Sequence, residues 1–491
     1  MRILFVDVDA LRPDHLGCYG YPRATSPTID RLAAEGARFE RCYVSDAPCL
    51  PSRTALSTGR FGIRNGVVGH GGTAADPTSL GAYRTFRTHD DYRPWFQALR
   101  DAGIRSTSVS SFPSRHGAWW FLAGLEAWHD PGGNGDERAE EVNAFAEPWL
   151  EAHAAQDDWL LHVNYWDAHT TYRTPAELGN LFEDAAPTTW LDQAAIDRHW
   201  AGYGPMSAQD GSLAWFGWRS PLPWVPEAIR TPADHQRWLD GYDTGIRYLD
   251  DHLARLIAIL ERKGVLDDTL IIVTADHGES QGELNVYGDH QTADETTCRV
   301  PMIVRWPDRV PAGLVDAELR YQFDLTAATV EWAGGTVPAA WDAQPAMTPD
   351  GAPRPGRDAL VLSQMAWSCQ RAVRLGDWLC IRTYDPGFKE LPEVLLFDVV
   401  ADPHQTTDLA SAHPQVVDAC LAQLERWQDD AMQRSLHDVD PMRTVLREGG
   451  PFHVRGELTG YQERLRATGR PAAAKALEAR YGSARGDGRD D

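Results

Sequence analysis

Cys49 and Arg53 are the pair of residues whose types and spacing could support nucleophilic chemistry in this chain. They lie in the segment 47–60, which reads Ala-Pro-Cys-Leu-Pro-Ser-Arg-Thr-Ala-Leu-Ser-Thr-Gly-Arg. If this segment is helical, Arg53 lies one turn after Cys49 and places a permanent positive charge beside it. Taken alone, Cys49 is more simply interpreted as an ordinary buried cysteine, which is common in protein cores. Motifs elsewhere in the chain therefore decide between the two interpretations.

Acidic and histidine side chains follow three strand-like apolar runs. Asp9 comes directly after the first run, Asp276 and His277 follow another, and His169 comes soon after a third. Strands that alternate with helices indicate a mostly parallel sheet, and such sheets carry their functional loops at the carboxyl ends of the strands. We therefore expect these side chains at one edge of a sheet. The simpler alternative for Asp276 and His277 is a solvated turn after a strand.

The segment around Cys49 resembles the activation motif of the type I sulfatases, Cys-x-Pro-Ser-Arg followed by a Thr-Gly-Arg-like tail. The resemblance extends to segments 8–17 and 274–279. It implies that a formylglycine-generating enzyme oxidises Cys49 to formylglycine (3-oxoalanine), whose hydrated form attacks the sulfate ester. Cys49 and Arg53 are then catalytic residues.

The same resemblance implies one divalent metal ion, held by Asp9, Asp276, His277 and the modified Cys49. Many sulfatases carry a second aspartate where this chain has Ala10. The ligand set is therefore similar to that of choline sulfatases and phosphonate monoester hydrolases. An imidazole in place of a carboxylate favours manganese over calcium as the metal.

Further residues are expected around the sulfate group. Segment 162–172 resembles the family pattern Asp-Pro-His-x-Pro-Tyr, which implies that His169 is catalytic and protonates the leaving oxygen. Segment 288–291 implies that His290 contacts the substrate. The family's Gly-Lys-Trp-His motif has no lysine here, and Arg115 and His116 are the candidates for its charge and its base. A surface or structural role is the alternative for each of these residues.

Asn65 and His70 follow the Cys49 motif along the chain. Both are expected to bind substrate, because the loop that carries them often faces the substrate in this family. For His70, as for His116, a structural role is an equal alternative.

The resemblance implies an α/β fold of the alkaline phosphatase-like type, with a large, mostly parallel sheet flanked by helices. We expect a catalytic domain over residues 1–355, and a smaller C-terminal α+β subdomain with its tail over 356–491, built on a short antiparallel sheet. A tryptophan-rich insert interrupts the first domain at about 185–235. Its indole rings could stack on a sugar or could simply fill a core. They belong to Trp190, Trp200, Trp215, Trp218 and Trp224.

The charge balance of the chain is strongly acidic, with 71 acidic and 47 basic residues and a formal net charge of −24. This argues against nucleic acid or an anionic membrane as a partner, so local cations must hold an anionic substrate. The first apolar run is too short for a signal peptide, and no stretch reaches the length of a membrane-spanning helix. We therefore expect a cytoplasmic protein.

The resemblance implies a sulfuric ester hydrolase that acts on an organic sulfate monoester, with a sulfated carbohydrate as an attractive substrate. The first alternative is hydrolysis of a phosphonate monoester or a phosphodiester by the same groups. The second alternative is an unmodified, catalytically silent binding protein.

Overall fold

The computed structural model describes residues 1–77, 92–211 and 220–482. The strands of its main sheet are β1 (Arg2–Val8), β2 (Ala37–Tyr43), β4 (Arg105–Val109), β5 (Ala127–His129), β6 (Trp159–Tyr165), β7 (Thr269–Ala275), β10 (Met302–Arg305) and β11 (Leu314–Tyr321). Their order is β11-β2-β10-β7-β1-β6-β4-β5. Only β10 is antiparallel to its neighbours among these strands. The predicted large, mostly parallel sheet is confirmed.

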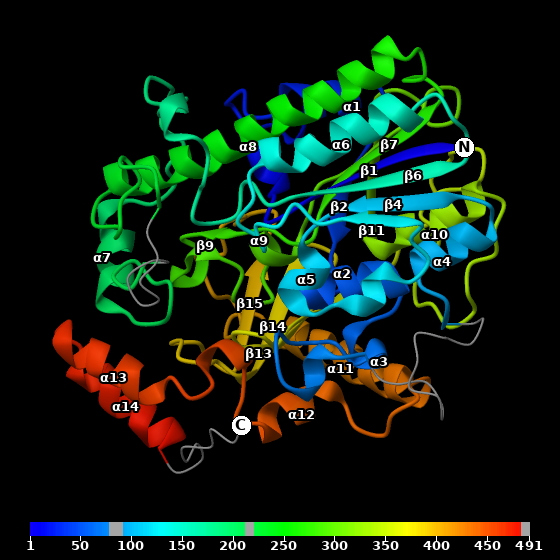
Figure 1. The fold of residues 1–491 in the computed structure, drawn as a ribbon. Coiled ribbons are helices and arrows are strands. Elements are labelled where there is room, and N and C mark those ends of the chain that lie inside the picture. Colours follow the sequence, from blue (N-terminus) through cyan, green and yellow to red (C-terminus); the bar gives the residue numbers. More distant parts are fainter. Residues whose placement is uncertain (78–91, 212–219, 483–491) are drawn as a thin grey trace.

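Helices cover both faces of the main sheet. One face carries α1 (Pro27–Ala34), α6 (Ala139–His153) and α8 (Pro232–Arg262), and the other carries α2 (Cys49–Thr58), α4 (Trp95–Asp101) and α10 (Phe323–Trp332) (Figure 1). Shorter elements are α3 (Gly62–Asn65), α5 (Phe112–His116), α7 (Gln193–Ala201), α9 (Glu295–Cys298) and the hairpin of β8 (Ser280–Gln281) and β9 (Tyr287–Asp289). Within the described residues, no helix combines the length and the apolar character needed to span a bilayer.

The register of the central strands brings the acidic residues together. β1, β6 and β7 are almost wholly buried, as expected for continuous apolar runs covered by helices on both faces. Val8 pairs with Ala275 of β7 and with Tyr165 of β6. The next residues along β1 and β7, Asp9 and Asp276, therefore leave the sheet side by side at its carboxyl edge.

A second, smaller sheet consists of β12 (Ala359–Gln364), β13 (Cys369–Leu375), β14 (Trp378–Asp385) and β15 (Val394–Asp398), paired antiparallel, with β3 (Asp46–Ala47) parallel to β12. Helix α11 (Pro414–Gln433) packs against it. This confirms the predicted short antiparallel sheet. β3 directly precedes the segment of Cys49, so the small sheet holds the start of α2. The domain boundary at residue 355 stays a prediction.

Helix α8 begins at Pro232, before the periodic apolar pattern that starts near residue 238. A capping box explains this start: Asp234 N–H donates to Thr231 Oγ1 at 3.1 Å, and Thr231 N–H donates to Asp234 Oδ2 at 3.0 Å.

The tryptophan-rich insert lies against the main core. Trp190, Trp200 and Trp224 are partly buried and pack on the main apolar cluster, which supports the core-filling interpretation for these three. Trp215 and Trp218 lie outside the described residues.

The C-terminal part continues with α12 (Pro441–Arg447), α13 (Leu458–Ala467) and α14 (Pro471–Tyr481). A buried ion pair fastens its beginning to the small sheet. Arg371 on β13 donates to both carboxylate oxygens of Asp440, at 2.7 and 2.8 Å, and the Arg371 side chain is fully buried. Asp440 also caps α12 through the N–H of Met442. The pair therefore anchors the start of α12, which follows α11, to strand β13 of the small sheet.

We expect Asp440→Ala to lower the free energy of unfolding by about 3–5 kcal/mol, because it leaves the Arg371 charge buried without a partner. The double variant Arg371→Met/Asp440→Ala should regain part of that loss, because no unpaired charge remains. Urea unfolding of the three proteins provides the measurement. A loss below about 1 kcal/mol for Asp440→Ala, or no recovery in the double variant, would contradict the assigned role.

Candidate active site

Arg53 lies at the centre of the carboxyl edge, one turn into α2. Its Nε donates to Asp7 Oδ2 at 2.7 Å, and its Nη1 donates to Asp9 Oδ2 at 3.1 Å and to Asp276 Oδ2 at 2.6 Å. All four side chains are fully buried. The guanidinium also lies over the ring of Trp166, at 5.2 Å from its centroid. Arg53 thus joins α2 to β1 and β7 through charge-assisted hydrogen bonds.

Cys49 is the first residue of α2 and adjoins this cluster. Its Sγ lies 3.1 Å from Nε2 of His277. The ligand atoms of Asp9, Cys49, Asp276 and His277 all lie within 4.8 Å of one another, and all four residues are buried. The structure therefore brings together the four residues that the sequence predicts as metal ligands.

The surroundings of Cys49 disfavour an ordinary thiolate nucleophile. Burial and the nearby carboxylates of Asp9 and Asp276 raise the pKa of the Cys49 thiol well above its usual value. Because the thiolate is the reactive form of cysteine, the encoded side chain is a poor nucleophile here.

The donor set fits a divalent cation on charge as well as geometry. Three carboxylates face one guanidinium, and Oδ1 of Asp7 and Oδ1 of Asp9 are buried without a hydrogen-bond partner in the described part of the chain. Burial raises the pKa of Asp276, and the carboxylates of Asp9 and Asp7 add to that rise. Burial lowers the pKa of His277 to about 4, which keeps its ring in the neutral, metal-binding form. A bound cation would supply the missing positive charge.

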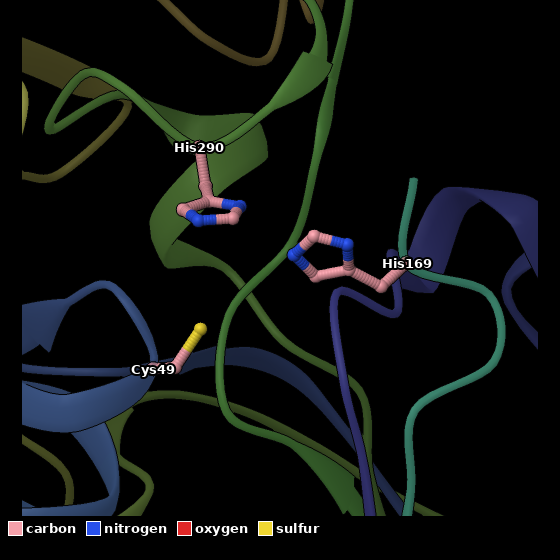
Figure 2. A group of neighbouring side chains, drawn as sticks. All are labelled: Cys49, His169 and His290. Atoms are coloured by element: carbon pink, nitrogen blue, oxygen red, sulfur yellow. The ribbon is translucent and has the colours of Figure 1, made fainter. Parts of the chain in front are cut away.

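His169 and His290 face Cys49 from two other loops (Figure 2). Their ring nitrogens and the Cys49 Sγ also lie within 4.8 Å of one another. The ring of His290 lies 4.0 Å from that of His277 and 5.4 Å from that of His169, centroid to centroid. The two imidazoles and the Cys49 side chain therefore form one cluster.

The remaining predicted residues are His70, His116, Arg115 and Asn65. His70 and His116 adjoin each other, with ring centroids 5.1 Å apart, and Nε2 of His116 is buried without a partner among the described residues. Arg115 lies over the Trp166 ring at 5.1 Å and is partly exposed. Asn65 lies apart: it is 1% exposed, and its amide bonds Arg60 O and the Val67 N–H.

The structure also shows residues that the sequence reasoning did not single out. His453 contacts His70, and Trp166 lies beside both Arg53 and Arg115. His162 lies 3.6 Å from Asp7. Trp166 lies within the segment 162–172 and directly follows β6, so its place in the sequence could have identified it. His453 lies in no motif and is distant in sequence, so no local pattern could have identified it.

Comparison with known proteins gives one family for this architecture. The Sulfatase family model matches residues 2–335. N-acetylgalactosamine-6-sulfatase of Canis lupus familiaris is 27% identical over 357 residues, which cover 68% of this chain and 62% of that protein. N-acetylglucosamine-6-O-sulfatase of Bacteroides thetaiotaomicron is 21% identical over 520 residues, which cover 91% of this chain and 89% of that protein. The chain thus spans less than two thirds of the first relative.

Solved structures share the fold. One is a protein in complex with its substrate D-glucosamine-2-N,6-O-disulfate, with a TM-score of 0.68 and 19% identity, covering 88% of this chain and 98% of that one. Another is the phosphonate monoester hydrolase of Silicibacter pomeroyi, with a TM-score of 0.64 and 19% identity, covering 89% and 96%. The family model covers most of the chain, including Arg53 and the three aspartates that it contacts. This chain therefore belongs to the Sulfatase family.

Proposed function

We propose that this chain hydrolyses a sulfate monoester of a carbohydrate, with a formylglycine made from Cys49 as its nucleophile. The observation that carries the proposal is the position of Cys49, buried at the start of α2 among the ligand atoms of Asp9, Asp276 and His277. Relatives whose names specify sulfated amino sugars support the carbohydrate part. A cytoplasmic location and activation by a formylglycine-generating enzyme belong to the same proposal.

Different residues around Cys49 would bind the metal ion and the sulfate group. Asp9, Asp276 and His277 would hold a divalent ion, for which we favour manganese over calcium. When bound, such an ion neutralises anionic oxygens and makes a bound hydroxyl easier to deprotonate. Arg53 fixes the two aspartates, and Arg115 and His290 would contact the sulfate oxygens.

His169 would protonate the leaving oxygen. Its Nδ1 donates to the backbone carbonyl of Thr170, so Nε2 is the nitrogen left to face the centre. Burial lowers the pKa of His169, while Asp9, 3.9 Å from Nε2, opposes that effect. The anionic substrate would act in the same direction as Asp9, because a negative charge stabilises the protonated ring.

A phosphonate monoester is the second candidate substrate. Two observations favour it: Ala10 stands where many sulfatases have an aspartate, and a phosphonate monoester hydrolase shares the fold. A sulfate monoester and a phosphonate monoester both carry one negative charge, whereas a phosphate monoester carries about two at neutral pH. The charge of the site therefore discriminates against the phosphate monoester, and only turnover separates the other two.

The modification of Cys49 is the first testable consequence. After co-expression with a formylglycine-generating enzyme, the peptide that contains Cys49 should show the mass change for conversion of a thiol to an aldehyde. Cys49→Ala should lower kcat/KM for an aryl sulfate by about 10³-fold or more, as expected for loss of a nucleophile. Cys18→Ala is the control and should keep full activity. An unconverted Cys49 without turnover would instead favour the silent binding protein.

Substrate choice provides the second test. With one aryl leaving group, we expect kcat/KM for the sulfate to exceed that for the phosphate monoester by about tenfold or more, a difference of about 1.4 kcal/mol. The physical reason is that the extra charge has no lysine to neutralise it: the only lysines of the chain are Lys263, Lys389 and Lys475, none of them in the Cys49 cluster. Faster hydrolysis of the aryl phosphonate than of the sulfate would favour the alternative.

Metal binding provides the third test. Manganese at 100 times its Kd should stabilise the wild-type protein by about 2.7 kcal/mol, seen as a rise in Tm. Asp276→Asn should remove that response. Since burial raises the pKa of Asp276, the charged side chain costs stability at neutral pH, so the metal-free variant should unfold at a higher temperature than the metal-free wild type. An unchanged metal response in Asp276→Asn would exclude this ligand set.

A further inference from the structure

His453 enters the site from the C-terminal part of the chain, beyond the residues that the family model matches. It lies in a short turn, Phe452–Val454, between α12 and α13. Its Nε2 is 2.9 Å from Nδ1 of His70. Its ring stacks on the buried Trp367 at 4.4 Å and an interplanar angle of 23°, and its backbone N–H donates to Ala366 O. Contacts with His70, Trp367 and Ala366 therefore fix the position of the His453 ring.

In the hydrogen bond between the two imidazoles, His70 is the donor and His453 is the acceptor. A hydrogen bond between two ring nitrogens needs one N–H and one lone pair, so the two rings cannot both be donors. The other nitrogen of His70, Nε2, accepts from the backbone N–H of Leu50 at 3.5 Å. An accepting Nε2 places the proton of His70 on Nδ1, and Nδ1 then donates to Nε2 of His453.

Leu50 directly follows Cys49 in the first turn of α2. The first N–H groups of a helix have no partner within the helix, and no side chain of the preceding Pro48 caps this one. Pro51 has no N–H to offer. His70 therefore supplies the acceptor at the helix start that carries the nucleophile, and its lone pair, not an N–H, is turned toward that end of α2.

We propose that His453 is a positioning residue for the reaction: it holds His70 in the Nδ1–H form, so that the lone pair of His70 Nε2 is directed at the start of α2 beside Cys49. The effect on turnover rests on the proposed sulfatase function, whereas the hydrogen-bond arrangement does not. In this role the C-terminal turn completes the site, although it contributes no ligand to the metal.

The arrangement can be read directly by ¹⁵N NMR of histidine-labelled full-length protein, with the His70 signals assigned from a His70→Asn variant. We expect a protonated Nδ1 and a bare Nε2 for His70 in the wild type. His453→Phe keeps the ring on Trp367 and removes the acceptor, so His70 should become a mixture of the two neutral forms. A wild-type His70 protonated on Nε2, or an identical spectrum in His453→Phe, would overturn the proposal.

Kinetics of two matched variants separate positioning from packing. His453→Phe should lower kcat/KM for the aryl sulfate by about 10–100-fold, mainly through kcat, as is typical when a supporting hydrogen bond is lost. His453→Gln retains a side-chain acceptor without the ring, and it should stay within about threefold of the wild type. A larger loss in His453→Gln than in His453→Phe would show that the ring packing matters and not the acceptor, and would overturn the proposal. Equal losses would show that a side-chain acceptor does not rescue turnover, and would overturn it as well.

His413→Phe serves as the control, because His413 also lies against an indole ring, that of Trp378, but in a different part of the C-terminal region. It should leave kcat/KM unchanged. Failure of the proposed function is distinguishable from failure of this inference. If the wild type converts no Cys49 or releases no sulfate, the sulfatase proposal fails, and the His70 spectrum still decides whether His453 sets the hydrogen-bond direction.

Discussion

The contact of Arg53 with Asp7, Asp9 and Asp276 is the interaction on which the rest of the site depends. Buried charges are costly unless they are paired, and here one guanidinium is surrounded by three carboxylates. Arg53 can reach all three only because β1 and β7 end in register and α2 points its first turn at that edge. The same contacts leave an excess of negative charge at the carboxyl edge, so the arrangement of the strands and α2 also creates a group of residues that could hold a cation.

The other side of the site is built from aromatic rings. Trp166 lies within cation–π distance of both Arg53 and Arg115, which places two guanidinium groups without a further carboxylate. Burial lowers the pKa values of His70 and His116, so both rings are neutral, and His70 contributes hydrogen bonds and not positive charge. The site therefore offers the guanidinium charges of Arg53 and Arg115 beside neutral imidazole rings.

Sequence patterns predicted those parts of the molecule whose causes are local. The apolar runs that became β1, β6 and β7, and the residues that follow them, could be placed because a buried parallel strand has a continuous apolar sequence. The start of α8 at Pro232 could not be read from apolar periodicity, because the capping at Thr231 lies before the periodic part. The pairing of β3 with β12 was missed because a two-residue strand has no pattern of its own.

His453 shows why the site as a whole could not be predicted. Its partner His70 is hundreds of residues away along the chain, and the contact exists only because the segment after α12 passes over the start of α2. That path depends in turn on the buried Arg371–Asp440 pair, which joins α12 to the small sheet, and on β3, which joins the same sheet to the Cys49 segment. The small sheet is therefore part of the framework around Cys49: it pairs with β3 just before α2, and it anchors the chain segment that carries His453.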